Sequence, residues 1–83
     1  MTRLFRPPQP LVVACSSDGL PCRVKAGGKA RQVTAVTETW TQHALPDGRS
    51  PDRTFYRVIV DGRAPWDIYH TPDGDWYLLR IIT

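Results

Sequence analysis

The sequence predicts an all-β protein on three observations: recurring reverse-turn signals, short apolar runs between them, and a proline and glycine content unsuited to long helices. Asp-Gly occurs four times in 83 residues, and Gly27-Gly28 adds a fifth signal of the same class. These dipeptides accept the positive φ of tight turns, and between apolar runs they predict β-hairpins. Eight prolines and six glycines disfavour a series of long helices. A chain of this length forms one domain at most.

Six segments between the turn signals are predicted to be strands. They are residues 10–16, 20–26, 30–41, 54–60, 65–71 and 76–82. The residues before them include Pro7 and Pro8 and show no alternation, so residues 1–9 are expected to form a flexible or extended N-terminal arm. Residues 10–83 then make up a single domain. Within it, residues 44–53 are the longest stretch rich in turn formers and form the main expected loop.

The third predicted strand is long enough to bend. Val33 and Val36 fall on opposite faces of a strict alternation within residues 30–41. A bulge or sharp bend is therefore expected near the middle of this strand. A bend of that kind lets one strand belong to two sheets.

The two cysteines, Cys15 and Cys22, bracket Asp18-Gly19. If Asp18-Gly19 is the tip of a two-residue hairpin, Cys15 faces Cys22 at a hydrogen-bonded rung, where the wide Cβ separation disfavours a disulfide. The same register puts Pro21 at a non-hydrogen-bonded rung, where its missing N–H costs nothing. Two reduced, packed thiols are therefore expected in preference to a disulfide. A metal site is expected least, because two ligands do not complete a tetrahedron.

The last hairpin is predicted to turn at Thr71-Pro72-Asp73-Gly74, as a type I turn followed by a G1 bulge at Gly74. The cross-strand pairs that follow are Ile68 with Leu78, His70 with Trp76, Tyr69 with Tyr77, Trp66 with Arg80 and Asp67 with Leu79. Both faces of the last strand are then apolar enough to be covered, so this strand is expected inside a closed structure. The expected architecture is a small five- or six-stranded antiparallel meander closed into an SH3-like barrel.

Positive charge is concentrated in the first third of the chain. Residues 1–31 contain Asp18 as their one acid and six cations: Arg3, Arg6, Arg23, Lys25, Lys29 and Arg31. Nine of the eleven cations in the chain are arginine, which forks onto phosphate and stacks on rings. The pattern is open to two interpretations, a phosphate-facing patch and an ordinary solvated surface with a coding bias toward arginine.

Residues suited to catalysis are few and scattered. Asp67 and His70 are three residues apart, which on a strand points them to opposite faces, and the serines lie at turns. No nucleophile elbow, phosphate loop or dinucleotide fingerprint is present. We therefore expect no enzyme activity, no cofactor and no metal site. Because the chain lacks an apolar stretch of about 18 residues, it is expected to be soluble and cytoplasmic, with no membrane partner.

The expected partner is nucleic acid. Aromatic and arginine side chains occur side by side, as in proteins that stack single-stranded bases and hold phosphates. The candidate contact residues are four cations for phosphates and an arginine with an aromatic for stacking: Arg23, Lys25, Lys29, Arg31, Arg57 and Trp40. The alternative is a protein-docking module that uses an open strand edge or an exposed tryptophan.

A family resemblance adds a biological setting. Trp66-Asp67-Ile68-Tyr69-His70 and Asp73 to Arg80 resemble a small bacterial domain of unassigned function. That domain is found alone or beside the Y-family polymerase-like proteins of mutagenesis cassettes in actinobacteria and Deinococcus-type bacteria. One departure is the absence of the aromatic expected before Gly28-Lys29-Ala30-Arg31, where this chain has Ala26 and Gly27. The resemblance implies a DNA-damage-response context and a possible partner protein in DNA repair.

Overall fold

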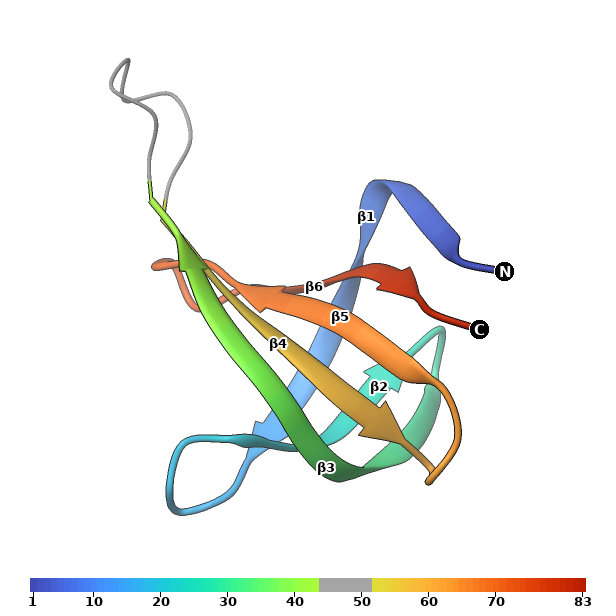
Figure 1. Ribbon diagram of the computed structural model, residues 1–83. Coiled ribbons are helices and arrows are strands. Elements are labelled where there is room, and N and C mark those ends of the chain that lie inside the picture. Colours follow the sequence, from blue (N-terminus) through green and yellow to red (C-terminus); the bar gives the residue numbers. More distant parts are fainter. Residues whose placement is uncertain (44–51) are drawn as a thin grey trace.

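The computed structural model describes residues 1–43 and 52–83. Its strands are β1 (Arg3–Cys15), β2 (Pro21–Ala26), β3 (Lys29–Gln42), β4 (Arg53–Val60), β5 (Pro65–His70) and β6 (Trp76–Ile81). Each strand pairs antiparallel with the next, and β1 also pairs with β6, so the sheet closes into a barrel (Figure 1). The predicted all-β, six-stranded closed meander is confirmed. The described residues include no helix that could cross a membrane.

The N-terminal residues extend β1 instead of forming an arm ahead of the domain. Arg3 pairs with Ile81 and Leu4 with Arg80 on β6. The register then shifts before Gln9 pairs with Leu78, so residues 5–8, which include both prolines, lie outside the ladder. Prolines fit such a segment because they have no N–H to donate. Residues 1–9 were expected to form a separate arm. Instead a strand begins at Arg3 and is stabilised by its pairing with β6.

The first hairpin has a three-residue loop, residues 17–19, between Ser16 and Leu20, so the expected two-residue tip is wrong. The Gly19 N–H donates to the Ser16 carbonyl at 2.9 Å, and the Ser16 N–H donates to the Leu20 carbonyl at 2.9 Å. Asp18 Oδ1 accepts a further hydrogen bond from the Leu20 N–H at 3.2 Å, so polar side chains stabilise the wider turn. As a result Cys15 lies opposite Pro21. Both cysteines are free as expected, but Cys15 is exposed and not packed.

Two other turns match their predictions. Gly27 and Gly28 both have positive φ, 59° and 83°, and form a two-residue tip between Ala26 and Lys29. In the last hairpin the Gly74 N–H donates to the Thr71 carbonyl at 3.0 Å, and Gly74 has a φ of 92°, as a type I turn with a G1 bulge requires.

The predicted bend in β3 consists of two bulges. The register against β4 shifts between Val33 and Ala35 and again between Val36 and Glu38, so Thr34 and Thr37 are extra residues. The Thr34 hydroxyl donates to the Ile59 carbonyl and the Thr37 hydroxyl to the Arg57 carbonyl, each at 3.2 Å. The bulges allow Val33 and Val36 both to pack against the core.

β3 has one strand edge that is only partly paired. Its first four residues pair with β2, and from residue 33 to residue 42 it pairs with β4 alone. Figure 1 shows that β2 runs beside only the beginning of β3. Among the described residues, the edge of residues 33–42 that faces away from β4 has no strand partner. The barrel is therefore splayed at the end where β3 stops.

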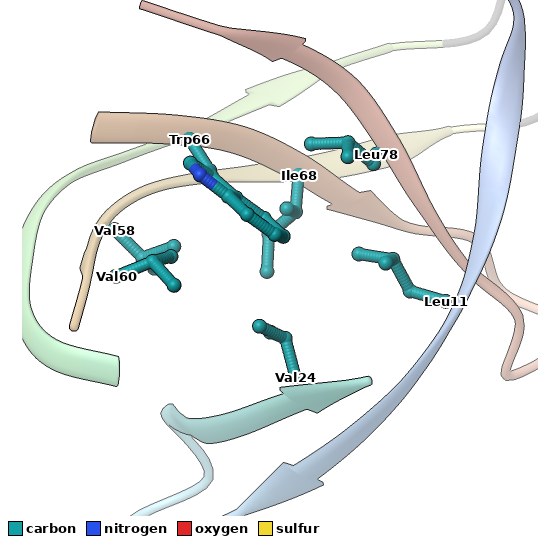
Figure 2. Close-up of a cluster of buried hydrophobic side chains, with 7 residues drawn as sticks. All are labelled: Leu11, Val24, Val58, Val60, Trp66, Ile68 and Leu78. Atoms are coloured by element: carbon teal, nitrogen blue, oxygen red, sulfur yellow. The ribbon is translucent and has the colours of Figure 1, made fainter. Parts of the chain in front are cut away.

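The core fills the barrel with side chains from five strands (Figure 2). Its members are apolar and almost fully buried: Leu11, Val24, Val58, Val60, Trp66, Ile68 and Leu78. Tyr56 and Trp76 pack against this cluster from the splayed end. Burial of each large side chain contributes about 1.5–3 kcal/mol, so the cluster fixes which face of every strand points outward.

The last hairpin departs from the expected register at one residue. The pairs Ile68–Leu78, Tyr69–Tyr77 and His70–Trp76 are as predicted. Beyond them Leu79 is an extra residue, so Asp67 faces Arg80 and Trp66 faces Ile81. The expected pairs Trp66–Arg80 and Asp67–Leu79 are therefore wrong. A one-residue shift moves side chains to the other face, which puts Arg80 outside the barrel beside Asp67.

Candidate nucleic-acid interface

The exposed cations of the β2–β3 hairpin are the part of the predicted site that is open to a partner. Arg23 and Lys25 flank Val24, which is fully buried, so both point away from the core. Lys29 follows the Gly27-Gly28 tip and is also exposed. Within the described chain, none of these three cations forms an ion pair. We call Arg23, Lys25 and Lys29 the basic hairpin.

Arg31 is separated from the basic hairpin by its own ion pair. It lies opposite Val24, and its guanidinium is 3.0 Å from the Asp61 carboxylate. Asp61 also accepts a hydrogen bond from the Gln32 N–H at 3.0 Å. Hydrogen bonds from the Gln32 backbone and from Arg31 hold the pKa of Asp61 below its usual range. Arg31 therefore ties β3 to the turn between β4 and β5.

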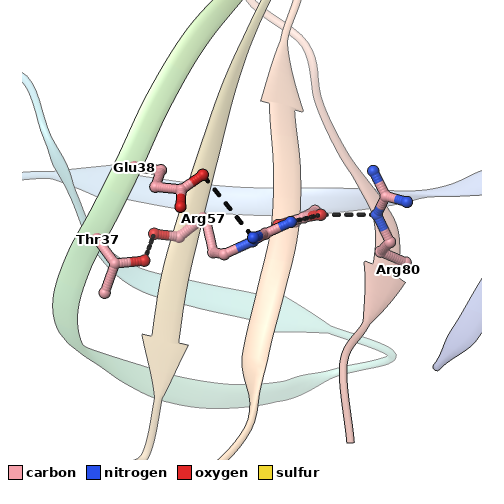
Figure 3. A network of polar contacts seen from close by, with 5 residues as sticks. Thr37, Glu38, Arg57 and Arg80 are labelled. Atoms are coloured by element: carbon pink, nitrogen blue, oxygen red, sulfur yellow. Dashed lines mark hydrogen bonds and ion pairs between the residues drawn. The ribbon is translucent and has the colours of Figure 1, made fainter. Parts of the chain in front are cut away.

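Arg57 belongs to a charged network on the outer face of β3 to β6 (Figure 3). Arg57 Nε lies 2.8 Å from Asp67 Oδ1 and Arg57 Nη2 lies 3.0 Å from Oδ2. Arg80 Nε lies 2.6 Å from the same Oδ2, and Glu38 approaches Arg57 Nη1 to 3.8 Å. Asp67 has no exposed surface. One buried carboxylate thus orients two guanidinium groups that remain partly exposed.

The pKa of Asp67 reflects this setting. Burial raises it, but hydrogen bonds from Arg57 and Arg80, together with their charges, outweigh burial and leave the pKa below its usual range. The hydrogen bond to Asp67 is also the main cause of a raised pKa at Arg57. Asp67 is therefore ionised at neutral pH and serves as the counter-charge of both arginines.

Trp40 is the first member of a row of four aromatic rings next to this network. Cross-strand pairing places Trp40, Phe55, Tyr69 and Tyr77 side by side on β3, β4, β5 and β6. Neighbouring ring centroids are 5.2 Å apart at each of the three steps. Phe55 and Tyr69 are only 5% exposed although they lie outside the barrel. We call these four rings the aromatic row.

Two arginines accompany the aromatic row. The Arg53 guanidinium lies 4.9 Å from the Tyr69 ring centroid, and that of Arg57 lies 5.8 Å from the Trp40 centroid. Both distances are within the range of cation–π contacts. The outer face of β3 to β6 therefore combines a row of aromatic rings with arginine side chains, of which Arg57 is paired with Asp67.

Sequence reasoning missed most of this outer face. The pair Tyr69–Tyr77 was predicted correctly, and the shared face of Phe55 and Arg57 follows from simple alternation. The pairing of Trp40 with Phe55 could be predicted only if the positions of the bulges in β3 were known. The contact between Arg80 and Asp67 could be predicted only if the extra residue in β6 was known. Neither irregularity has a sequence signal as clear as Asp-Gly.

His70, the histidine nearest to Asp67 in the sequence, takes part in packing. Its ring stacks on Trp76 with centroids 4.6 Å apart, on the face of β5 opposite to Asp67. Tyr56 contacts the same Trp76 with centroids 5.4 Å apart. The part of the chain that the structure describes contains no cluster of three or more metal-ligating side chains.

Comparison of the chain with protein-family models, with curated proteins and with solved structures gave no match. The resemblance to a small bacterial domain of mutagenesis cassettes thus remains an expectation from sequence. The basic hairpin and the aromatic row are the two surfaces of the described part of the protein that suit a ligand.

Proposed function

We propose that this protein is a non-enzymatic accessory module that binds nucleic acid through the basic hairpin. The observation that supports the proposal most directly is the contrast among its cations. Arg31, Arg57 and Arg80 are held by carboxylates of the chain itself, at Asp61 and Asp67. The basic hairpin is exposed and has no such partner among the described residues. Its charges are available to neutralise phosphates and release their counterions.

Two of the three charges of the hairpin share one face, whereas Lys29, which pairs with Ala26, lies on the other. Arg23 and Lys25 lie on the same face of β2, about 7 Å apart at the usual rise of a strand. β2 is paired on both sides, with β1 and with β3. The two cations are thus carried on a paired strand, where little backbone order is lost on binding.

The proposed biological setting is the cytoplasm and the response to DNA damage. This part of the proposal depends on the resemblance of residues 66–80 to the small domain of mutagenesis cassettes. Binding to nucleic acid is compatible with a role beside a polymerase or a repair protein, in which the module would supply affinity and no chemistry of its own.

A salt titration tests the proposal. Wild-type protein should bind a fluorescently labelled single-stranded oligonucleotide at about 50 mM salt. Its log Kd should rise linearly with the logarithm of the salt concentration. The triple variant Arg23→Gln, Lys25→Gln, Lys29→Gln should bind more weakly, with a slope smaller by about 0.7 for each phosphate that it no longer neutralises. The matched control exchanges the cations, Arg23→Lys, Lys25→Arg, Lys29→Arg, and should retain most of the affinity.

Two results would reject the proposal. One is the absence of binding to any single-stranded or duplex oligonucleotide at about 50 mM salt. The other is an unchanged affinity and salt slope in the folded triple variant, which would place the binding surface elsewhere.

The partly unpaired edge of β3 favours protein docking as the second candidate function. Residues 33–42 pair with β4 alone, and an extended peptide can add to a free edge through main-chain hydrogen bonds. Capture of a polymerase or recombination protein that persists after nuclease treatment, and is abolished by Thr39→Pro substitution in β3, would favour this function over nucleic-acid binding.

A further inference from the structure

The aromatic row has one covered end and one open end. At the covered end Tyr77 lies opposite Pro10 of β1, the next strand of the barrel. At the other end Trp40 belongs to the part of β3 that pairs with β4 alone. No further strand among the described residues stands beside Trp40. Within residues 1–43 and 52–83, the row of rings therefore stops at Trp40, with no further ring on its far side.

The orientation of the Trp40 ring makes this open end a stacking surface. The indole and the Phe55 ring are parallel within 2°, with centroids 5.2 Å apart. One indole face is therefore turned toward Phe55 and β4, and the opposite face is turned toward the free edge of β3. Trp40 is half-buried, whereas Phe55 and Tyr69 behind it are 5% exposed. Packing of the inner rings fixes the terminal ring in place before any ligand arrives.

The charged groups near Trp40 carry both signs. Arg57 is held by two hydrogen bonds to Asp67 while its guanidinium stays 5.8 Å from the Trp40 centroid. Arg53 stands over Tyr69, two rings further along. Because Asp67 neutralises Arg57 and the Glu38 carboxylate lies 3.8 Å from it, Trp40 offers a stacking surface, and the phosphates are left to the basic hairpin.

We propose that Trp40 stacks an unpaired base of single-stranded nucleic acid as a fifth ring of the aromatic row. This inference rests on the proposed function and specifies its substrate class. A base in a duplex already has both faces covered by its neighbours, whereas an unpaired base has a free face to place on the indole. The basic hairpin then supplies affinity for the backbone, and Trp40 supplies the preference for single strands.

The test compares ligands that share phosphates and differ in their bases. Kd is measured at matched salt for oligothymidylate, its ribose counterpart oligouridylate, an abasic strand of the same length and a duplex, each of about twelve nucleotides. Wild-type protein should bind both base-bearing strands more tightly than the abasic strand, by about 5- to 100-fold for one stacked base. Binding to the duplex depends on its phosphates alone, so its Kd should not change when Trp40 is replaced by leucine.

Two variants assign the preference to the indole. Trp40→Leu keeps an apolar side chain and removes the ring, so the ratio of abasic to oligothymidylate Kd should fall to about one, with the salt slope unchanged. Trp40→Phe keeps a smaller ring and should retain part of the ratio. Circular dichroism and thermal unfolding establish that both variants are folded. The Kd ratio of the wild-type protein tests stacking by itself, without any variant.

Each other outcome overturns the inference in a distinct way. Equal Kd for abasic strand and oligothymidylate rejects stacking and leaves the proposed function standing. An unchanged ratio in folded Trp40→Leu rejects Trp40 as the stacking residue. Binding to none of the four ligands rejects this inference and the proposed function together, and nuclease-resistant binding of a protein through Trp40 would assign the ring to a protein partner instead.

Discussion

Arg80 and Asp67 lie in direct contact because Leu79 is an extra residue in β6. Arg80 Nε is 2.6 Å from Asp67 Oδ2. With a regular register, Arg80 would lie opposite Trp66 and point into the barrel. The bulge moves it to the outer face, where it shares the buried carboxylate with Arg57. The charged network and the irregularity of the strand therefore depend on each other.

Removal of the Asp67 charge should destabilise the fold. Asp67→Asn keeps the shape of the side chain but leaves Arg57 and Arg80 without their counter-charge, at an expected cost of about 1–3 kcal/mol. The cost stays in this range because the two arginine side chains, 31% and 38% exposed, can still be hydrated. Urea unfolding measures it. The control Glu38→Gln, at an exposed carboxylate 3.8 Å from Arg57, should cost less than about 0.5 kcal/mol. Equal effects would contradict the prediction.

Acid should abolish the contribution of Asp67. Burial raises its pKa, but the hydrogen bonds and charges of two arginines lower it further, so the folded protein takes up this proton at lower pH than the unfolded chain. The stabilisation is therefore complete above the ordinary aspartate pKa of about 3.9 and disappears as pH falls through the lower folded value. The difference in unfolding free energy between wild type and Asp67→Asn should shrink as pH is lowered from 7 to below the ordinary aspartate pKa of about 3.9.

The comparison of wild type with Asp67→Asn isolates the titration of Asp67. Asp18 and Asp61 also have lowered pKa values, but they titrate in both proteins and cancel in the difference. A difference that stays constant or grows on acidification would show that Asp67 stabilises the fold by packing and not by charge.

The two threonines at the bulges of β3 should each stabilise the fold modestly. Thr34→Val and Thr37→Val remove hydroxyls that donate to the Ile59 and Arg57 carbonyls and should each cost about 0.5–1.5 kcal/mol. Thr39→Val is the matched control, since Thr39 pairs regularly with Tyr56 on the same strand. Valine also favours strands, so the Thr39→Val variant should be neutral or slightly stabilising in thermal unfolding. A cost at Thr39 as large as at Thr37 would reject the role of the bulge hydrogen bonds.

Cys15 should react slowly for an exposed thiol. Partial burial raises its pKa, and the charges of Cys22 and Asp18 raise it further, so less thiolate is present at neutral pH. Iodoacetamide at pH 7 should modify Cys15 more slowly than it does in the urea-unfolded chain, and the two rates should converge as pH rises above about 9. Asp18→Asn should speed the reaction slightly. Peptide mass spectrometry follows each cysteine separately, and a faster reaction in the folded protein would contradict the assignment.

The turn residues explain why the strand order was predictable. Gly27-Gly28 and Thr71-Pro72-Asp73-Gly74 restrict the backbone locally, so their hairpins follow from a few adjacent residues. The conflict between Val33 and Val36 likewise indicated an irregular third strand. The beginning of β1 carries no such signal, because Arg3 and Leu4 become a strand only through partners on β6, at the far end of the chain.

The candidate site was predictable only in part for a similar reason. Alternation alone places Arg23 and Lys25 on one face of β2. The position of Arg31 opposite Val24, on the other face, follows only from the register across the Gly27-Gly28 turn. The partner of Arg31, however, is Asp61, thirty residues away, and no local pattern indicates that ion pair. Long-range register, set by bulges at single residues, decides which charges are neutralised and which stay available.

The two bulges of β3 also affect how molecules of this protein meet one another. A sheet edge as long as residues 33–42 is a template for edge-to-edge self-association, and hence for cross-β aggregates, when its hydrogen-bonding groups are evenly spaced. Thr34 and Thr37 interrupt that spacing twice. The bulges therefore disfavour continuous edge-to-edge pairing along residues 33–37 and leave the regular residues 38–42 as the part of the edge that is able to accept another strand.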